Sequence, residues 1–487
     1  MAESIIYQLN CNQRHDKCFY IKLKKSKAHI IILGYNNRRY YLLRSLLASF
    51  HPISSGWVGE NIFLLSESSL YILTIPSFTL VQVPLPAYKI IDILFFSFEK
   101  GYIYSSIIDP DYIDFYFKSN STSDIKIASY KISEKKTLFF KSSSLQFEPC
   151  IILNYLKEFK IAHEQNIYDI FNGHKLKIVH SELHSKISID ENCITTVFGC
   201  IDRGFFFGEK IIYTYSSLIQ PSTVRMHITN VSTVRNSINN QSKKHIFSIS
   251  YNDNNIASPF YHLSRLEKTK KGTIVMLHGG PAARYSNRFD QMAYSLANAG
   301  YSIHLLNYPG STGYGYAYQK KLYGNAGTFD CNAVISYLNS LSQKDASLPL
   351  YLIGDSYGAF LAILVLLKAS KNISKVYALN AFTDIRYQFL FSNARAVITK
   401  YFPEITSTKI RQINPIDLVA KGQLKDCLLI INGLDDLYCP KEQLIQFQSI
   451  SGCDVILMPN YPHYKIDPAE TDKITRIILE DMRGKRE

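Results

Sequence analysis

Long apolar runs are missing from this sequence. The longest spans about nine residues, from Ala359 to Leu367, which is roughly half of what a membrane-crossing helix needs. The first residues, up to Cys11, contain neither a basic segment nor an apolar core of the length found in secretory leaders. We therefore expect no membrane-spanning helix, no membrane partner and a cytoplasmic location.

Paired cysteines are missing as well. The nine cysteines are odd in number and scattered along the chain, and no two of them form a C-x-x-C pair. This spacing argues against a disulfide framework and against a structural zinc site, and it favours reduced thiols. The sequence predicts no cofactor and no metal site.

Basic clusters are few, although the formal net charge is +14. Lysine and arginine are spread along the chain, and they gather only at residues 22–27 and 483–486. A lysine-rich solvated surface accounts for this pattern better than a nucleic-acid site does, so no nucleic-acid partner is expected.

The N-terminal part of the chain is rich in short runs of β-forming residues. At 487 residues the chain exceeds the size of a single hydrophobic core, so we expect two domains. Residues 1–235 contain β-type runs, such as 29–33, 62–65 and 70–75, separated by turn residues. A repeat of roughly 40 to 50 residues predicts a reduced β-propeller of about four or five blades. A β-sandwich or an irregular β-domain stays open, and residues 230–244 are predicted to be a linker.

Residues 245–487 follow a different pattern, in which strands alternate with helices. The run 273–277 is a continuous apolar strand, 289–299 is a helix, and 302–306 is the next strand. Alternation of this kind predicts an α/β domain with a mostly parallel sheet and helices on both faces. Ligands bind at the carboxyl ends of the strands in such sheets.

One stretch of this domain carries a candidate nucleophile. Gly354-Asp-Ser356-Tyr-Gly358 follows an apolar strand and precedes an apolar helix. The pattern Gly-x-Ser-x-Gly in that setting is typical of the nucleophile elbow of α/β-hydrolases, where a tight turn exposes the serine hydroxyl. Without that setting the motif is weak, and an ordinary strand-helix turn would explain it.

A serine hydroxyl needs a base, and the base needs an orienting carboxylate. In α/β-hydrolases these partners follow the serine in the order acid, then histidine. The strand near 428–431 leads into Asp435 and Asp436, and the strand ending at Met458 leads to His463. We expect His463 to be the base and one of the two aspartates to orient it.

Catalysis of acyl transfer also needs donors for the oxyanion of the tetrahedral intermediate. The strand 273–277 runs into the glycine-rich turn His278-Gly-Gly-Pro281. We expect the backbone N–H groups of Gly280 and Tyr357 to form the oxyanion hole.

With these elements in place, the C-terminal part resembles the prolyl oligopeptidase family of serine peptidases, especially its acylaminoacyl-peptidase-like branch. The resemblance rests on six segments: His278–Pro281, Asn307–Gly315, Gly354–Gly358, Asn414–Asp417, Gly433–Asp436 with Pro440, and His463. In the family the acid stands three residues after the glycine and four before the proline, which selects Asp436 over Asp435. The resemblance implies a serine peptidase of short peptides that works through an acyl-enzyme, and an N-terminal β-propeller. The N-terminal region is shorter than the usual seven blades require.

Three questions stay open at the level of sequence. The same triad could serve an esterase, or a peptide transacylase or macrocyclase, and the chain could also be an inactive binding or scaffold protein. The substrate pocket is expected between Phe382 and Tyr401, where Arg386 or Arg395 could hold a substrate carboxylate or carbonyl. The sequence does not show whether the chain would act as an exopeptidase or an endopeptidase, and it does not show the oligomeric state.

Overall fold

The computed structural model describes most of the chain. The described residues are 4–24, 27–36, 39–48, 54–58, 60–66, 69–75, 77–83, 92–97, 101–106, 112–118, 125–131, 136–139, 167–228, 246–253, 258–266, 268–344, 347–369, 373–402, 404–405, 407–459, 461, 463 and 468–484. The chain divides into two compact units, Met1–Ser216 with Pro221–Asn240, and Ser217–Gln220 with Gln241–Glu487. The predicted linker, 230–244, lies outside the described residues.

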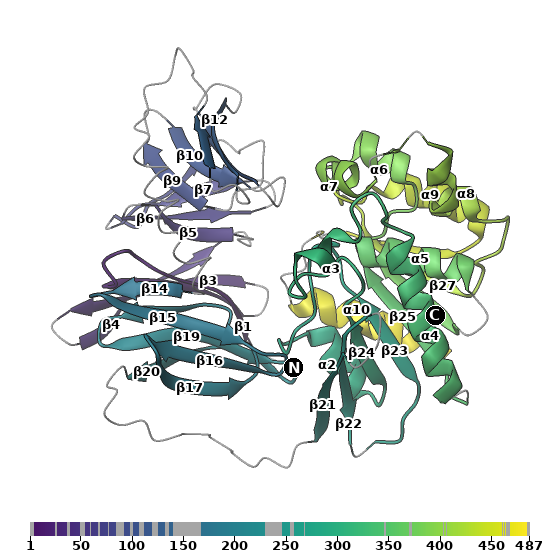
Figure 1. The fold of residues 1–487 in the computed structure, drawn as a ribbon, viewed down its shortest axis with the longest axis horizontal. Coiled ribbons are helices and arrows are strands. Elements are labelled where there is room, and N and C mark those ends of the chain that lie inside the picture. Colours follow the sequence, from purple (N-terminus) through teal and green to yellow (C-terminus); the bar gives the residue numbers. More distant parts are fainter. Residues whose placement is uncertain are drawn as a thin grey trace. The chain divides into compact units, whose positions relative to one another are not determined.

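The described part of the first unit consists of β-strands and their connections. Its described part forms five antiparallel sheets, each built from strands consecutive in sequence and coloured purple to teal in Figure 1. The first two sheets contain β1 (Ser4–Cys11), β2 (Lys17–Lys24), β3 (Lys27–Asn36) and β4 (Arg39–Ala48), then β5 (Ser54–Val58), β6 (Asn61–Leu65), β7 (Leu70–Leu73) and β8 (Leu80–Val83). The third contains β9 (Asp92–Ser97), β10 (Gly101–Ser106), β11 (Tyr112–Lys118), β12 (Ile125–Lys131) and β13 (Lys136–Phe139). The last two contain β14 (Ile167–Phe171), β15 (His174–His180), β16 (His184–Ile189) and β17 (Asn192–Phe198), then β18 (Gly204–Phe207), β19 (Lys210–Ser217) and β20 (Gln220–Ile228).

Contacts between the described sheets follow one pattern. The first strand of one sheet contacts the first strand of another: β1 contacts β5, β5 contacts β9, β14 contacts β18, and β18 returns to contact β1. The apolar faces of neighbouring sheets meet between them. Leu9 and Cys18 of the first sheet, for example, pack against Phe207 and Ile212 of the last. The predicted β-structure of this part of the chain is confirmed for the described residues. The propeller and its number of blades stay predictions.

The second unit is built on one eight-stranded sheet with the order β21-β22-β24-β23-β25-β26-β27-β28. The strands are β21 (Phe247–Asn252), β22 (Phe260–Arg265), β23 (Thr273–Leu277), β24 (Ser302–Leu306), β25 (Leu350–Asp355), β26 (Lys375–Leu379), β27 (Leu428–Gly433) and β28 (Asp454–Met458). β21 and β22 form an antiparallel hairpin, β22 is antiparallel to β24, and all other pairs are parallel. All five residues of β23 are buried, as expected for a strand covered on both faces.

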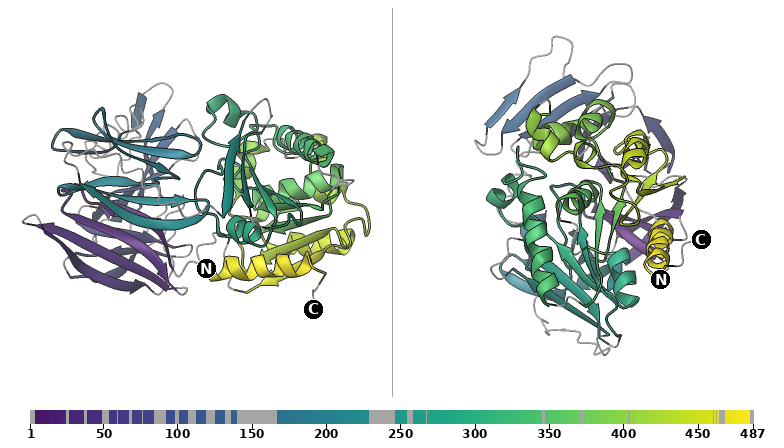
Figure 2. Two further views of the ribbon diagram at one scale, coloured as in Figure 1. Left: turned by 90° about the horizontal axis from the view of Figure 1, so that it is seen from below. Right: turned by 90° about the vertical axis from the view of Figure 1, so that its right-hand side faces the viewer.

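Helices flank this sheet on both sides, as Figure 2 shows. They are α2 (Gln291–Asn298), α3 (Tyr316–Lys320), α4 (Phe329–Lys344), α5 (Tyr357–Lys368), α6 (Ile385–Phe391), α7 (Arg395–Tyr401), the 3₁₀ helix η3 (Thr408–Gln412), α8 (Pro415–Leu418), α9 (Lys441–Ser451) and α10 (Pro468–Asp481). α2 packs with α10, while α5 packs with both α4 and α8. Residues 357–366 of α5 are buried throughout, which explains why this helix is apolar on every side. The predicted α/β fold is confirmed.

After β23 the chain places β24 on one side of this strand and then β25 on the other side. This strand lies between β24 and β25, so its carboxyl end and that of β25 form a topological switch point. The candidate oxyanion turn follows β23 and the candidate nucleophile follows β25. Within the described part of the chain, no helix has the length and apolar character needed to cross a membrane.

Candidate active site

Ser356 occupies a strained position between β25 and α5. Its backbone has φ 52° and ψ −115°, a conformation that non-glycine residues adopt rarely and at a cost. Its N–H donates to the carbonyl of Leu379 on the neighbouring strand β26, at 2.8 Å. The flanking glycines leave room for the turn: a Cβ on Gly354 would lie 2.1 Å from the Gly358 carbonyl oxygen, and one on Gly358 would lie 2.3 Å from the Leu277 carbonyl oxygen. Both glycines are therefore required for this geometry.

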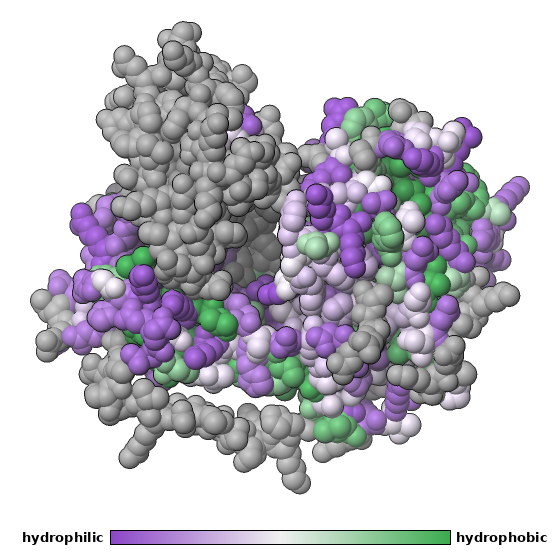
Figure 3. Space-filling model, viewed as in Figure 1, coloured by the Kyte–Doolittle hydropathy of each residue, from purple (hydrophilic) through white to green (hydrophobic). Residues whose placement is uncertain are grey.

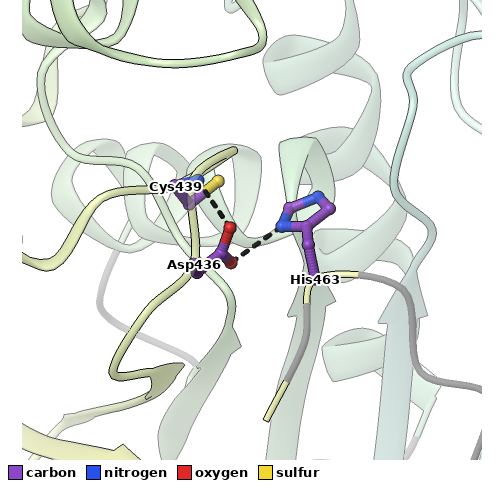
Figure 4. A group of neighbouring side chains, drawn as sticks. All are labelled: Asp436, Cys439 and His463. Carbon is purple, nitrogen blue, oxygen red and sulfur yellow. Dashed lines mark hydrogen bonds and ion pairs between the residues drawn. The ribbon is translucent and has the colours of Figure 1, made fainter. Parts of the chain in front are cut away.

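The predicted nucleophile, base and acid come together. His463 Nε2 lies 3.0 Å from Ser356 Oγ, and His463 Nδ1 lies 2.8 Å from Asp436 Oδ2. Figure 4 shows the bond between the imidazole and the carboxylate. With the Nδ1 proton donated to Asp436, Nε2 is left to accept the proton of the serine hydroxyl. Asp435 is exposed, and Asp436 is buried.

Asp436 is held by its own loop. Its second oxygen, Oδ1, accepts the backbone N–H of Tyr438 at 2.8 Å and that of Cys439 at 2.9 Å. Gly433 begins this turn, and a Cβ there would lie 2.0 Å from the carbonyl oxygen of Tyr461, in the segment that leads to His463. The absent side chain lets the loop of the acid and the loop of the base pack directly on each other.

Asn380 links these loops and was not identified from the sequence. It follows β26, is fully buried, and has φ 46°. Its Nδ2 donates to the carbonyl of His463 at 3.4 Å, and its Oδ1 accepts the N–H of Gly433 at 3.3 Å. The sequence does contain a signal for Asn380: it is a polar residue directly after an apolar strand of a parallel sheet.

The glycine-rich turn after β23 lies against the elbow. A Cβ on Gly279 would lie 3.3 Å from Ser356 Cβ, so this turn runs directly past the nucleophile. Gly280, the predicted oxyanion donor, has φ 123°, which favours glycine. Tyr357, the second predicted donor, is the first residue of α5, where N–H groups have no partner within the helix. Helix N-termini stabilise negative charge.

His278, the first residue of the candidate oxyanion turn 278–281, is held by buried contacts. Its Nε2 lies 2.7 Å from Ser311 Oγ, and its ring stacks on Tyr308 with 4.4 Å between centroids. The Tyr308 hydroxyl donates to the His278 carbonyl at 2.6 Å. Burial lowers the pKa of His278 to about 4, so the ring is neutral near pH 7. The segment Asn307–Gly315, noted in the sequence for its resemblance, thus supports the oxyanion turn.

The segment predicted to line the substrate pocket contains both buried and exposed side chains. Phe382 and Tyr401 are buried in the core of the second unit, while Phe391 is 64% exposed. Figure 3 shows apolar side chains at the surface over α6 and α7, the region that holds Phe391. Arg386 makes two hydrogen bonds of 2.7 Å to the Asp417 carboxylate.

The pairing of Arg386 explains the segment Asn414–Asp417. The Asn414 Oδ1 accepts the N–H of Ile385 at 2.8 Å, and its Nδ2 donates to Asp417 Oδ2 at 2.9 Å. Asn414 and Asp417 therefore fix the start of α6 and its arginine. Arg395 lies over the ring of Phe389, 4.5 Å from its centroid.

Comparison with known proteins gives a consistent result for the second unit. Residues 287–450 match the prolyl oligopeptidase family, a range that contains Ser356 and Asp436. Acylamino-acid-releasing enzyme 1 of Oryza sativa subsp. japonica is 36% identical over 98 residues, which cover 20% of this chain and 12% of that enzyme. The predicted resemblance to this family of hydrolases is thereby confirmed, although the match covers only a small part of the curated relative.

Solved structures match over nearly the whole chain. Pyrococcus horikoshii acylaminoacyl peptidase aligns with a TM-score of 0.60 and 14% identity, over 99% of this chain and 88% of its own. A Mycobacterium tuberculosis puromycin-hydrolysing peptidase aligns with a TM-score of 0.66 and 11% identity, over 98% and 94% of the two chains. At such identities the likeness establishes the shared fold.

Proposed function

We propose that this chain, whose second unit is that of the prolyl oligopeptidase family, is a serine peptidase that hydrolyses peptide bonds of short peptides through an acyl-enzyme. The observation that carries the proposal is the continuous contact from Ser356 through His463 to Asp436, at 3.0 and 2.8 Å. These residues lie beside a glycine-rich turn and a helix N-terminus, where an oxyanion is best stabilised.

The first half of the reaction forms the acyl-enzyme. Ser356 Oγ attacks the carbonyl carbon of the scissile peptide bond while His463 Nε2 takes the hydroxyl proton. Asp436 stabilises the imidazolium through the Nδ1–H bond. The N–H groups of Gly280 and Tyr357 hold the negative oxygen of the tetrahedral intermediate. The C–N bond then breaks, and His463 returns its proton to the leaving amine.

The second half releases the acid product. Water gives a proton to His463 Nε2 and attacks the ester carbonyl, and the second tetrahedral intermediate uses the same two backbone donors. Its collapse returns the proton to Ser356 Oγ and frees a carboxylic acid. The enzyme is thereby restored.

A fluorophosphonate probe tests the proposal directly, because it forms a covalent bond only with an activated serine. We expect peptide mapping to find the label on Ser356, and the Ser356→Ala variant to lose both the label and peptide turnover, by about 10⁶-fold in kcat. A folded wild-type protein that takes no label would support the scaffold alternative instead.

The mass of the product shows whether water, the peptide's own amine or another amine accepts the acyl group. A peptidase product contains the elements of water, whereas a macrocyclic product does not, and transfer to an amine adds the amine. Paired peptides with free and acetylated N-termini then test the acylaminoacyl-type specificity that the relatives' names suggest. An ester-only substrate profile would favour the esterase alternative.

A further inference from the structure

A cysteine thiol lies beside the acid and the base of the triad. Cys439 follows Asp436 by three residues on the same loop, and the ligand atoms of Asp436, Cys439 and His463 all lie within 4.8 Å of one another. Figure 4 shows the thiol, the carboxylate and the imidazole grouped together. Cys439 is 1% exposed, and the side chains of Asp436 and His463 are 0% and 11% exposed. The proposed mechanism does not use this thiol.

Sulfur, imidazole nitrogen and carboxylate oxygen are the ligands that zinc prefers in proteins. Tetrahedral zinc with bonds of roughly 2.0 to 2.3 Å holds its ligand atoms about 3.3 to 3.8 Å apart. The three side chains here need shifts on the order of 1 Å to reach that spacing. The hydrogen bond between His463 and Asp436, now 2.8 Å, would open to admit the ion.

The sulfur also has a polar neighbour of the kind that surrounds metal-bound thiolates. Gln388 Nε2 lies 3.8 Å from Cys439 Sγ. Gln388 is itself fixed by Gln443, whose Nε2 donates to Gln388 Oε1 at 2.8 Å, and both amides are buried. Amide donors held in this way orient and stabilise metal ligands.

We propose that Asp436, Cys439 and the Nδ1 atom of His463 bind a zinc ion that reversibly switches off the catalytic triad. A metal on Nδ1 requires the imidazole proton to reside on Nε2, and Nε2 then cannot accept the proton of Ser356. The ion also replaces the hydrogen bond by which Asp436 orients the ring. The thiol releases one proton to solvent when zinc binds, and water completes the coordination.

The effect on turnover rests on the proposed function, but binding of the ion does not.

Cobalt(II) reports on binding without any need for activity. With thiols kept reduced, titration of the Ser356→Ala protein with cobalt should produce a thiolate-to-cobalt charge-transfer band, and zinc should displace it. The Cys439→Ala variant should lack the band. Cys427→Ala is the matched control, because Cys427 precedes β27 at the end of the strand opposite to the loop with Asp436 and Cys439. This control should retain the band.

Zinc inhibition is then measured against each protein's own metal-free turnover. The zinc concentration for half-inhibition should rise at least ~10-fold in Cys439→Ala, since even changes outside the metal ligands weaken metal sites by that factor. It should not change in Cys427→Ala. Equal inhibition of both variants, or a cobalt complex without a thiolate band, would overturn the proposal. A chain with no peptidase activity that still shows the band would refute the proposed function and leave the metal site standing.

Discussion

The Tyr357 hydroxyl donates a hydrogen bond of 2.5 Å to Asp330 Oδ2, and both side chains are buried. Tyr357 follows the nucleophile in sequence, so this bond ties the first turn of α5 to the first turn of α4. Burial raises the pKa of Asp330 to about 6, although its hydrogen bonds to Tyr357 and to the backbone oppose this shift. The base of the elbow therefore contains a carboxyl group that titrates in a mildly acidic range.

This carboxyl should make the stability of the protein depend on pH. The folded-state pKa lies above the ordinary value of 3.8 for an aspartate, so the native state binds the proton more tightly than the unfolded state does. Its contribution is complete below pH ~4 and is lost as the pH rises through about 6, on the order of 2–3 kcal/mol. Urea unfolding at pH 4 and pH 8 should show a smaller loss of stability in Asp330→Asn than in the wild type. The same loss in both proteins would mean that Asp330 is not the source.

Asp436 should matter for catalysis far more than its neighbour. Asp436→Asn keeps the shape of the side chain but can hold His463 in the wrong tautomer, and we expect kcat to fall about 10⁴-fold. Asp435→Asn is the matched control, since the Asp435 side chain is exposed and its loss should leave kcat within a factor of two or so of wild type. Steady-state kinetics on one peptide substrate compares them, and a larger effect at Asp435 would reverse the assignment.

Ser311 should affect kcat, because it holds His278, and should have little effect on substrate binding. Ser311→Ala leaves the buried imidazole without its 2.7 Å partner and loosens the oxyanion turn, so kcat should fall ~10- to 100-fold with little change in KM. Thr312→Ala, at the next and only partly buried position, serves as the control. A rise in KM at constant kcat would show that the turn shapes substrate binding instead.

Gly433→Ala should separate the two loops of the triad. The new methyl group would lie 2.0 Å from the Tyr461 carbonyl oxygen, and neither backbone segment can move aside without shifting Asp436 or His463. We expect a loss of at least ~2 kcal/mol in unfolding free energy and slow fluorophosphonate labelling. Gly422→Ala has φ 70° and open space around it, so it should cost only the left-handed backbone penalty of ~1 kcal/mol and label normally.

The elements of the second unit were predictable because their sequence patterns are local. The predicted strands 273–277 and 302–306 coincide with β23 and β24. Every residue in these strands is buried, and a short continuous apolar run is typical of a strand that is covered on both faces. The predicted helix at 289–299 is observed as α2, Gln291–Asn298, which begins after Asp290, whose side chain accepts the N–H of Ala293. Ser356, Asp436 and His463, which the structure brings together, could be predicted as one group because each follows a strand of a parallel sheet.

The supporting residues could not be identified in the same way, because their roles depend on contacts between distant segments. Asn380 bridges loops that follow two other strands, and no spacing rule relates it to Gly433 or His463. Arg386 was a candidate for substrate binding on charge alone, yet Asp417, 31 residues away, is its partner. Cys439 was counted only as one unpaired thiol, since proximity to His463 is a property of the folded loop.

The base of the triad is supplied after the strand at the edge of the sheet. Among the described strands, β28 pairs with β27 alone, and His463 lies beyond it, 107 residues after Ser356. Under the proposed mechanism, a chain synthesised only through Asp436 contains the nucleophile and the orienting carboxylate but lacks the base. Under the proposed mechanism, hydrolysis can therefore begin only after the chain has been extended past His463.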